Sequence, residues 1–403
     1  MEWKLKDLTV DGKGSYGIGA PAVPYQEDKL TYLRITDIND DGLLNFSDLK
    51  SVDAEDAEKY ILKENDIVFA RTGNSTGRSY FYEKQHGTFV YAGFLIKFSL
   101  DPNKVNPRIL KYYTHSKPYF DWVNSFDTGA TRGNINAKTY GDMEIELPSR
   151  KVQDKIVSIL SSLDRKIELN NKINADLEEM AQAIFKNWFV DFEPFKDGKF
   201  VDSELGMVPE GWKVGTLGDF CKCLLGGTPS RSKEEYWNGD VNWINSGEIN
   251  KFRILEASEK ITELGLSKSA TKLLPKKTTV LAITGATLGQ VSLLEIDTCA
   301  NQSVIGVLEN TEIPYEYIYP FIKDRIEMLI QHQTGGAQQH INKDNVESLI
   351  FLLPAKNVLE NYISLVGPMY KRIESQCFEN LYLSTLRDTL LPRLMSGELE
   401  VPE

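Results

Sequence analysis

The sequence predicts an α+β protein with two pseudo-repeated domains separated by an antiparallel pair of long coiled-coil helices. Three observations support this prediction. The second half of the chain repeats the first in outline, and each half ends in an amphipathic stretch of nearly 40 residues. The remaining segments mix short β-branched or aromatic runs with Gly, Asn and Pro turns. A chain of 403 residues is also too long for one ordinary domain.

The internal repeat has an offset of roughly 206 to 212 residues, which is far longer than a solenoid unit. The matching segments keep the same order in both halves: Trp3-Lys4-Leu5 with Trp212-Lys213-Val214, Asp37-Ile38-Asn39 with Glu248-Ile249-Asn250, 131–136 with 337–342, and Leu147-Pro148 with Leu353-Pro354. This order predicts domains at 1–148 and 198–354, a central long helix with a linker at 149–197, and a C-terminal long helix with a tail at 355–403.

Each predicted long helix carries one apolar stripe at the spacing of a coiled coil. Such a helix is roughly 55 Å long and needs a partner, and the other copy is the obvious partner. Asn170, Asn171 and Asn174 interrupt the first stripe, and they could set the register at the seam or lie on its solvated edge. The residues expected to pack between the helices are Ile156, Leu160, Leu163 and Ile167 in the first, and Tyr362, Val366, Met369 and Ile373 in the second.

Shorter elements can be placed within each domain. Runs rich in β-branched and aromatic residues predict strands at 67–70, 89–98, 279–283 and 290–294. The spacing of apolar residues predicts helices over 104–123 and 314–331. Each domain is therefore expected to contain a substantial sheet together with helices.

The sequence contains no recognisable catalytic centre. Residues 12–17 match the dinucleotide pattern G-x-G-x-x-G, but Pro21 and Pro24 follow at once, so no helix can begin there. No phosphate-binding loop or histidine metal pair is present, and Cys221 and Cys223 lack a second ligand pair. We therefore expect no catalytic residue, no metal site, no cofactor bound by this chain, and reduced cysteines.

Composition and charge limit the location and the partners. No apolar run is long enough to span a membrane, and the first residues lack the apolar core of a signal peptide, so we expect a cytoplasmic protein with no membrane partner. The net charge of −12 argues against nucleic acid. The charge is uneven, however: residues 37–66 hold ten acidic and three basic side chains, and residues 67–138 hold ten basic and four acidic ones.

Two pairs of polar, glycine-containing loops lie at corresponding places: 71–78 with 284–290, and 128–136 with 334–342. Arg can read guanine, Asn and Gln can read adenine, and hydroxyl groups suit phosphates. One such loop would be an ordinary turn, but two corresponding loops in each half favour recognition of DNA. The candidate DNA-contacting residues are Arg71, Thr72, Asn74, Ser75, Arg78, Thr131, Arg132 and Asn134 in the first half, and Thr284, Gln290, Gln338, Gln339 and His340 in the second.

The order of variable domain, long helix, variable domain and long helix resembles the specificity subunits of type I restriction–modification systems. The resemblance covers essentially the whole chain. At the start of the first helix Gln153 follows Val152, whereas Leu359 follows Val358 in the second, and this is a departure between the copies. The similar local stretches are WFVDFEPF at 188–195, SELGMVPEGW at 203–212, GGTPS at 226–230 and LPRLMSG at 391–397.

The resemblance implies a subunit that is not itself an enzyme. It would bind double-stranded DNA at an asymmetric bipartite target, one half read by each target-recognition domain. It would also dock two methyltransferase subunits and the motor-nuclease subunits, and these partners would carry S-adenosylmethionine, ATP and Mg²⁺. Two alternatives stay open: an adaptor whose twin domains bind proteins, and a specificity protein co-opted by a different defence or phage-exclusion system. The Arg, Asn and Gln loops favour DNA.

Overall fold

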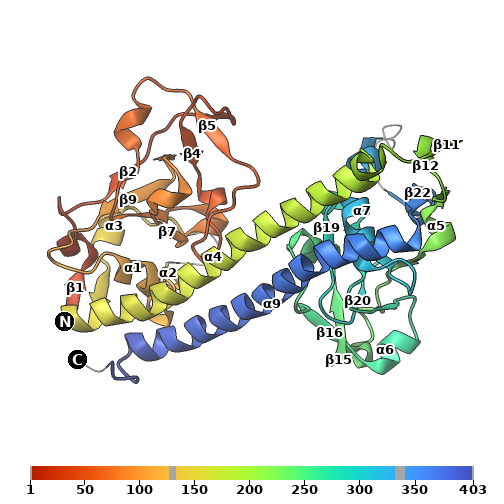
Figure 1. The fold of residues 1–403 in the computed structure, drawn as a ribbon. Helices are drawn as coiled ribbons and strands as arrows, with labels where there is room; N and C mark the ends of the chain where they lie inside the picture. Colours follow the sequence, from red (N-terminus) through yellow and green to blue (C-terminus); the bar gives the residue numbers. More distant parts are fainter. Residues whose placement is uncertain (1, 127–132, 332–340, 402–403) are drawn as a thin grey trace. The chain divides into compact units, whose positions relative to one another are not determined.

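The computed structural model of the chain describes residues 2–126, 133–331 and 341–401 (Figure 1). The chain divides into two compact units: unit 1 comprises residues 1–166 and 383–403, and unit 2 comprises residues 167–382. The two 40-residue helices, α4 (Arg150–Phe189) and α9 (Lys356–Met395), each pass from one unit into the other.

Unit 1 contains a main sheet of order β2-β9-β6-β7, a second sheet of order β3-β5-β4-β8, and the pair β1–β10. Its strands are β1 (Glu2–Lys4), β2 (Ser15–Tyr16), β3 (Ala22–Pro24), β4 (Thr31–Leu33), β5 (Lys50–Val52), β6 (Asp66–Ala70), β7 (Ser79–Phe81), β8 (Phe89–Tyr91), β9 (Leu95–Ser99) and β10 (Glu144–Glu146). Its short helices are α1 (Arg108–Tyr113), α2 (Lys117–Asn124) and α3 (Ala137–Gly141).

Unit 2 repeats this plan, with a main sheet of order β14-β21-β18-β19, a second sheet of order β16-β15-β20-β17, the pair β13–β22, and the hairpin β11–β12. Its strands are β11 (Phe200–Ser203), β12 (Gly206–Pro209), β13 (Lys213–Thr216), β14 (Lys222–Leu225), β15 (Trp237–Ile244), β16 (Glu259–Ile261), β17 (Leu273–Leu274), β18 (Thr279–Ala282), β19 (Val291–Leu293), β20 (Thr298–Ala300), β21 (Val304–Leu308) and β22 (Ile350–Leu353). Its shorter helices are α5 (Leu217–Phe220), α6 (Glu263–Ser267), α7 (Tyr315–Gln331) and α8 (Lys343–Glu347).

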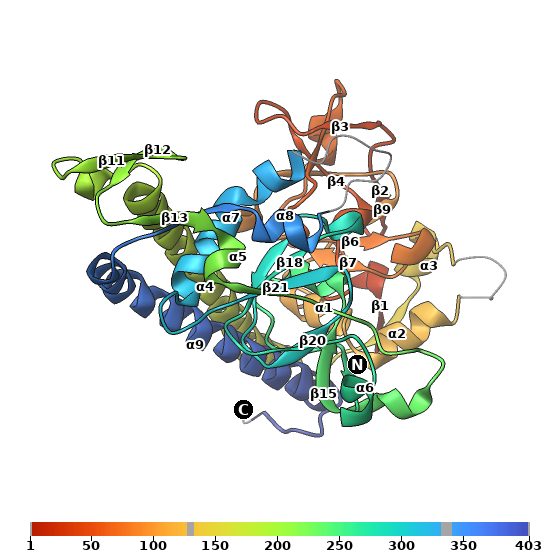
Figure 2. The ribbon, with the colours of Figure 1, turned by 90° about the vertical axis from the view of Figure 1, so that its right-hand side faces the viewer.

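The registers of the two main sheets correspond residue by residue. In unit 2, β18 and β21 lie side by side (Figure 2), as β6 and β9 do in unit 1. The second sheets differ at both edges in their named strands, because β3 lies beyond β5 in unit 1 whereas β17 lies beyond β20, the counterpart of β8, in unit 2. The equivalent pairs are Ala70–Leu95 and Tyr16–Ile96 in unit 1, and Ala282–Val304 and Leu225–Ile305 in unit 2.

Most of the expected elements are present, and two of them are divided. The predictions for 67–70, 279–283, 290–294 and 314–331 correspond to β6, β18, β19 and α7. The strand expected over 89–98 is two strands, because the chain turns where Leu95 N donates to Ala92 O at 2.8 Å. The helix expected over 104–123 is α1 and α2, because a proline near the start of α2 fits only the first turn of a new helix.

The apolar stripes of the long helices are buried, but their partners differ from those expected. In unit 1, Ile156 and Leu160 near the start of α4 share a core with Leu391 and Leu394 near the end of α9. The expectation that the eight stripe residues pack together was wrong, because Ile156 and Leu160 lie in the core of unit 1, whereas Tyr362 and Val366 lie in the core of unit 2. Within unit 1 the early part of α4 packs against the late part of α9. Leu163 is half-buried.

In unit 2 the late part of α4 packs against the early part of α9. Tyr362 and Val366 lie in one core with Phe185, and Met369 packs against that core. The rings of Phe185 and Tyr362 are 6.5 Å apart, centroid to centroid. Among the remaining stripe residues, Ile373 is buried and Ile167 is half-buried.

The asparagines that interrupt the α4 stripe lie both at the seam and beside it. Asn170 and Asn174 are buried, whereas Asn171 is exposed. Gln376 Nε2 donates to Asn170 Oδ1 at 3.0 Å, and Asn380 Nδ2 donates to Asn171 Oδ1 at 2.8 Å. Asn170 and Gln376 occupy the same position in two helices of equal length, so this amide layer marks a common register for the pair.

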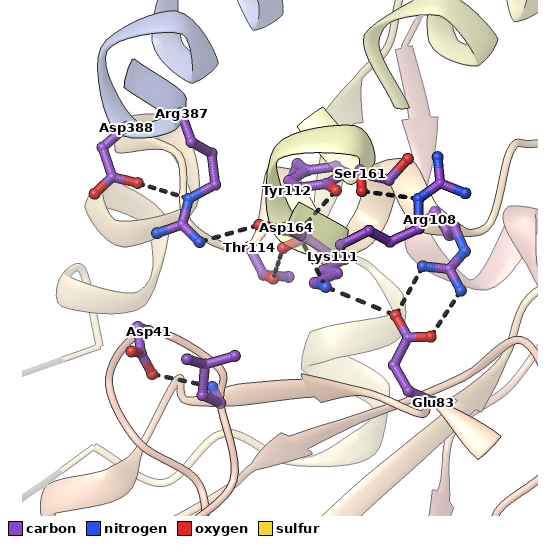
Figure 3. A network of polar contacts seen from close by, with 12 residues as sticks. Asp41, Glu83, Arg108, Lys111, Tyr112, Thr114, Ser161, Asp164, Arg387 and Asp388 are labelled. Atoms are coloured by element: carbon purple, nitrogen blue, oxygen red, sulfur yellow. Dashed lines mark hydrogen bonds and ion pairs between the residues drawn. The ribbon is translucent and has the colours of Figure 1, made fainter. Parts of the chain in front are cut away.

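A buried carboxylate of α4 anchors the domain of unit 1 (Figure 3). Asp164 accepts a hydrogen bond from the Tyr112 hydroxyl at 3.0 Å and pairs with Lys111 Nζ at 3.1 Å, both of which come from α1. Arg387 Nη1 of α9 approaches the other carboxylate oxygen at 3.1 Å. Lys111 also lies 3.6 Å from the carboxylate of Glu83, so the network continues toward the main sheet.

A second buried carboxylate of α4, Glu178, has the same role in unit 2. It pairs with Arg253 at 2.7 Å and with Lys323 of α7 at 2.6 Å, and it accepts a hydrogen bond from the Tyr319 hydroxyl at 2.8 Å. Burial by itself would raise the pKa of Glu178, but Arg253 and Lys323 outweigh burial and lower it. Likewise, burial opposes ionisation of Asp164, but Lys111 and Arg387 hold its pKa below the usual value.

We predict that Asp164→Asn lowers the free energy of unfolding by about 1.5–3 kcal/mol at neutral pH, because it removes the buried charge that Lys111 and Arg387 share and leaves them only Glu83 and Asp388. Since the folded-state pKa is lowered, the stabilisation by Asp164 is present above the ordinary carboxyl pKa and is lost as the pH falls through the folded value. The difference between wild type and variant, measured by urea unfolding from pH 7 to pH 3, should therefore narrow in acid.

Asp154→Asn is the matched control, because Asp154 lies on the same helix and pairs with Arg150 on the exposed surface. Its loss should cost at most about 1 kcal/mol. A cost for Asp164→Asn as small as that of the control, or one that does not change with pH, would show that the buried network does not anchor the domain.

Candidate nucleic-acid interface

In unit 1 three segments that are distant in sequence meet at one end of the main sheet. β6 ends at Ala70, and the N–H of Arg71 donates to Phe94 O at 3.1 Å. The N–H of Gly17, directly after β2, donates to Leu95 O at 3.2 Å. A Cβ atom on Gly17 would lie 2.2 Å from Tyr91 O, so the close approach of this segment to the end of β8 requires glycine. We call this end of the sheet the strand edge.

Both of the loops predicted to bind DNA are joined at this strand edge. Thr76 Oγ1 donates to Gly133 O at 2.8 Å, and Ile135 N donates to Arg71 O at 2.9 Å. Directly after this contact, Asn136 caps α3 by accepting a hydrogen bond from Thr139 N at 2.9 Å. The structure therefore brings together loop 71–78 and the described part of loop 128–136.

The strand edge of unit 2 has the same backbone connections. Ile283 N donates to Ser303 O at 2.9 Å, Ile341 N donates to Ile283 O at 3.0 Å, and Gly226 N donates to Val304 O at 3.0 Å. In addition, the side chain of Thr228 contacts that of Gln302. The framework of hydrogen bonds is thus common to the two units, while the side chains on it differ.

The candidate residues of unit 1 differ in how far their side chains are exposed and free to contact DNA. Asn74 and Asn134 are exposed, and Thr72 is half-buried. Ser75 is only 7% exposed, so its hydroxyl offers little surface to a ligand, and we remove it from the candidate set. Arg78 Nε lies 2.6 Å from Asp40, and Arg78 Nη1 donates to Ile38 O at 3.1 Å.

In unit 2, Gln290 is exposed and Thr284 is half-buried, and they flank the turn between β18 and β19. Five candidate residues lie outside the described part of the chain: Thr131, Arg132, Gln338, Gln339 and His340. Their assignment as DNA contacts stays a prediction.

Two aromatic residues of the strand edge in unit 1 were missed by the sequence reasoning. Tyr16 is 42% exposed, and its hydroxyl accepts a hydrogen bond from Ala137 N at 3.0 Å. Phe94 is 58% exposed. Tyr16 belongs to the glycine-rich stretch 12–17, to which the sequence pattern assigns no site. Pairing Gly17 with Gly226 across the repeat would have been the signal that this stretch lies at the strand edge.

Burial suppresses ionisation of the cysteine thiols in the described part of the chain, and no cluster of metal-ligating side chains lies there. Burial raises the pKa of Cys221 and Cys223 to about 12 and that of Cys299 to about 11, so these thiols are poor nucleophiles. Within residues 2–126, 133–331 and 341–401, no group of three or more His, Cys, Asp or Glu side chains could hold a metal ion. In the same residues, no helix is long and apolar enough to cross a membrane.

Comparison with known proteins places this architecture in a family. The family model described as type I restriction modification DNA specificity domain matches residues 15–179 and again residues 209–361. The chain therefore belongs to the family of type I restriction–modification specificity subunits. The two matched regions cover the two halves of the repeat, including most of α4.

Two curated relatives and one solved structure illustrate the likeness. The type I restriction enzyme MjaIX specificity subunit of Methanocaldococcus jannaschii is 29% identical over 73% of this chain and 69% of its own length. The HindI specificity subunit of Haemophilus influenzae is 25% identical over 85% of this chain and 88% of its own length. The crystal structure of a type I S subunit from M. genitalium covers 100% of this chain and 96% of its own, at 15% identity and a TM-score of 0.58, and it supports the fold.

Proposed function

We propose that this chain reads double-stranded DNA at a bipartite target, with one half-site contacted by the strand edge of each unit. The observation that carries the proposal is the repeated framework of backbone hydrogen bonds, Arg71–Phe94 and Ile283–Ser303, on which the two units present different polar side chains. Reading two different half-sites requires loops in the same position that carry different side chains, and this framework provides them.

The chemistry of the strand edges suits duplex DNA better than a protein partner. Arg71, Asn74 and Asn134 in unit 1, and Gln290 in unit 2, supply the donors and acceptors that read base edges in a major groove. Arg78 is balanced by Asp40 in this structure, so its contribution requires that this ion pair open.

The partners follow from membership of the family. We propose that two methyltransferase subunits dock on the chain and that motor-nuclease subunits complete the restriction form. S-adenosylmethionine, ATP and Mg²⁺ would be bound by these subunits. In this arrangement the chain supplies the choice of DNA sequence, and it leaves the transfer of the methyl group to its partners.

The proposal predicts that the purified chain transfers no methyl group from S-adenosylmethionine to DNA, and that it does so once its methyltransferase partners are added. The assembled complex should bind duplex DNA with an affinity that falls steeply and log-linearly with salt, because phosphate contacts release counterions. Methyl transfer by the chain alone, or an assembly with no salt-dependent affinity for duplexes, would overturn the proposal in favour of an enzyme or a protein adaptor.

We also propose that α4 and α9 form one long antiparallel coiled coil that sets the spacing between the half-sites. A 40-residue helix is about 60 Å long, and DNA advances about 34–36 Å per turn. Half-sites read from such a support should be centred on the order of one to one and a half turns apart, with unread base pairs between them. A test of this spacing role must lengthen both helices by the same number of residues.

The test inserts four residues after Lys166 and four after Tyr382, where both helices pass between the units. This keeps the Asp164–Arg387 and Asn170–Gln376 contacts within their own units. Because four residues add about 6 Å, the unread spacer should lengthen by about one or two base pairs while both half-sites stay the same. Methylation-site mapping checks this, and altered half-sites with an unchanged spacer would refute the role of the helices.

A further inference from the structure

The guanidinium of Arg71 lies over an aromatic ring at the strand edge of unit 1. Its central carbon is 5.0 Å from the ring centroid of Tyr16, a cation–π distance. Tyr16 lies on β2 opposite Ile96 of β9, and its hydroxyl is held by Ala137 N. The ring is therefore fixed on one side by the sheet and on the other by the start of α3.

The backbone of Arg71 is fixed as well. Its N–H donates to Phe94 O, and its carbonyl accepts from Ile135 N. Within the described residues, the Nε of Arg71 has no hydrogen-bond partner, whereas the guanidinium of Arg78 is paired with Asp40. Of the two arginines in loop 71–78, Arg71 is thus the one that lies over an aromatic ring and that has no carboxylate partner among the described residues.

Unit 2 has the same backbone at this place but none of these side chains. By strand register, Leu225 stands where unit 1 has Tyr16. By the shared hydrogen bonds, Ile283 stands in place of Arg71, and Ser303 in place of Phe94. The stacked arginine is therefore a property of one domain on a framework that both domains share, which is the expected pattern for a determinant of one half-site.

We infer that Arg71 reads a guanine in the half-site of unit 1, and that Tyr16 is the positioning residue that orients the guanidinium for it. The inference rests on the proposed DNA-reading function. A planar guanidinium can donate two parallel hydrogen bonds to the O6 and N7 atoms of guanine. An aromatic ring that holds the group in place before binding reduces the side-chain freedom lost when the contact forms.

The test compares four variants, each assembled with the partner methyltransferases and used to select duplexes from a randomised pool. Arg71→Ala should reduce the preference for guanine at one position of one half-site on the order of tenfold to a hundredfold. Arg71→Lys should reduce the same preference but keep the salt dependence of binding, because it retains the charge and loses the planar fork.

Tyr16→Leu should weaken the preference at the same position by about threefold to tenfold, and Tyr16→Phe should keep most of it because the ring remains. The other half-site is an internal control for folding and assembly, because unit 2 lacks the stacked pair. Tyr25→Leu is the matched control, since Tyr25 is 48% exposed directly after β3 and the variant should leave every position unchanged.

The outcomes separate this inference from the function on which it rests. If the wild-type assembly selects no sequence, the proposed function fails. If it selects a bipartite target and Arg71→Ala alters no position, Arg71 is not a reader and the inference is wrong. If Tyr16→Leu lowers affinity for all duplexes equally with an unchanged base profile, Tyr16 has only a structural role and its assignment as a positioning residue is wrong.

Discussion

Each domain is fixed to the long helices by a buried carboxylate of α4, Asp164 in unit 1 and Glu178 in unit 2. A buried carboxylate is costly unless cations and hydrogen-bond donors surround it, so each one specifies its partners closely. In both units the partners include a lysine and a tyrosine of one domain helix, which is α1 for Asp164 and α7 for Glu178. This polar contact fixes how each domain packs on α4, and the position of each strand edge therefore depends on it.

At the strand edges, backbone hydrogen bonds fix the loop geometry, while the side chains differ between the two units. Backbone hydrogen bonds such as those of Ile135 and Ile341 need no particular side chain, so two divergent domains can keep the same loop geometry. Glycine is required at Gly17 and Gly226, where an added Cβ would lie 2.2 Å from a carbonyl oxygen, and it is favoured at Gly73 and Gly285, which share a positive φ of 74°. The other positions are free to differ, and in the proposed function their differences are what distinguish one half-site from the other.

Much of the architecture could be predicted because it depends on local or periodic features of the sequence. The repeat offset, the apolar stripes and the Leu-Pro pairs before the helices indicated two domains and two helices of nearly 40 residues. The stripes did not show which residues of the two helices face each other, and grouping Ile156 with Tyr362 was wrong because these residues lie in different cores. Nor could all residues of the strand edge be predicted. Tyr16 lies beside Arg71 because of strand pairing, and Arg78 pairs with Asp40, which is 38 residues earlier in the chain.

The measurement that tests the central claim most directly is a map of the bases methylated when the chain is combined with its proposed methyltransferase partners. We expect one asymmetric DNA sequence pattern, in which two short constant segments are separated by a fixed number of unconstrained base pairs. The reason is that two different strand edges belong to domains attached to the same pair of helices. A single uninterrupted constant segment, or methylation without any sequence preference, would contradict the claim that the two units read separate half-sites.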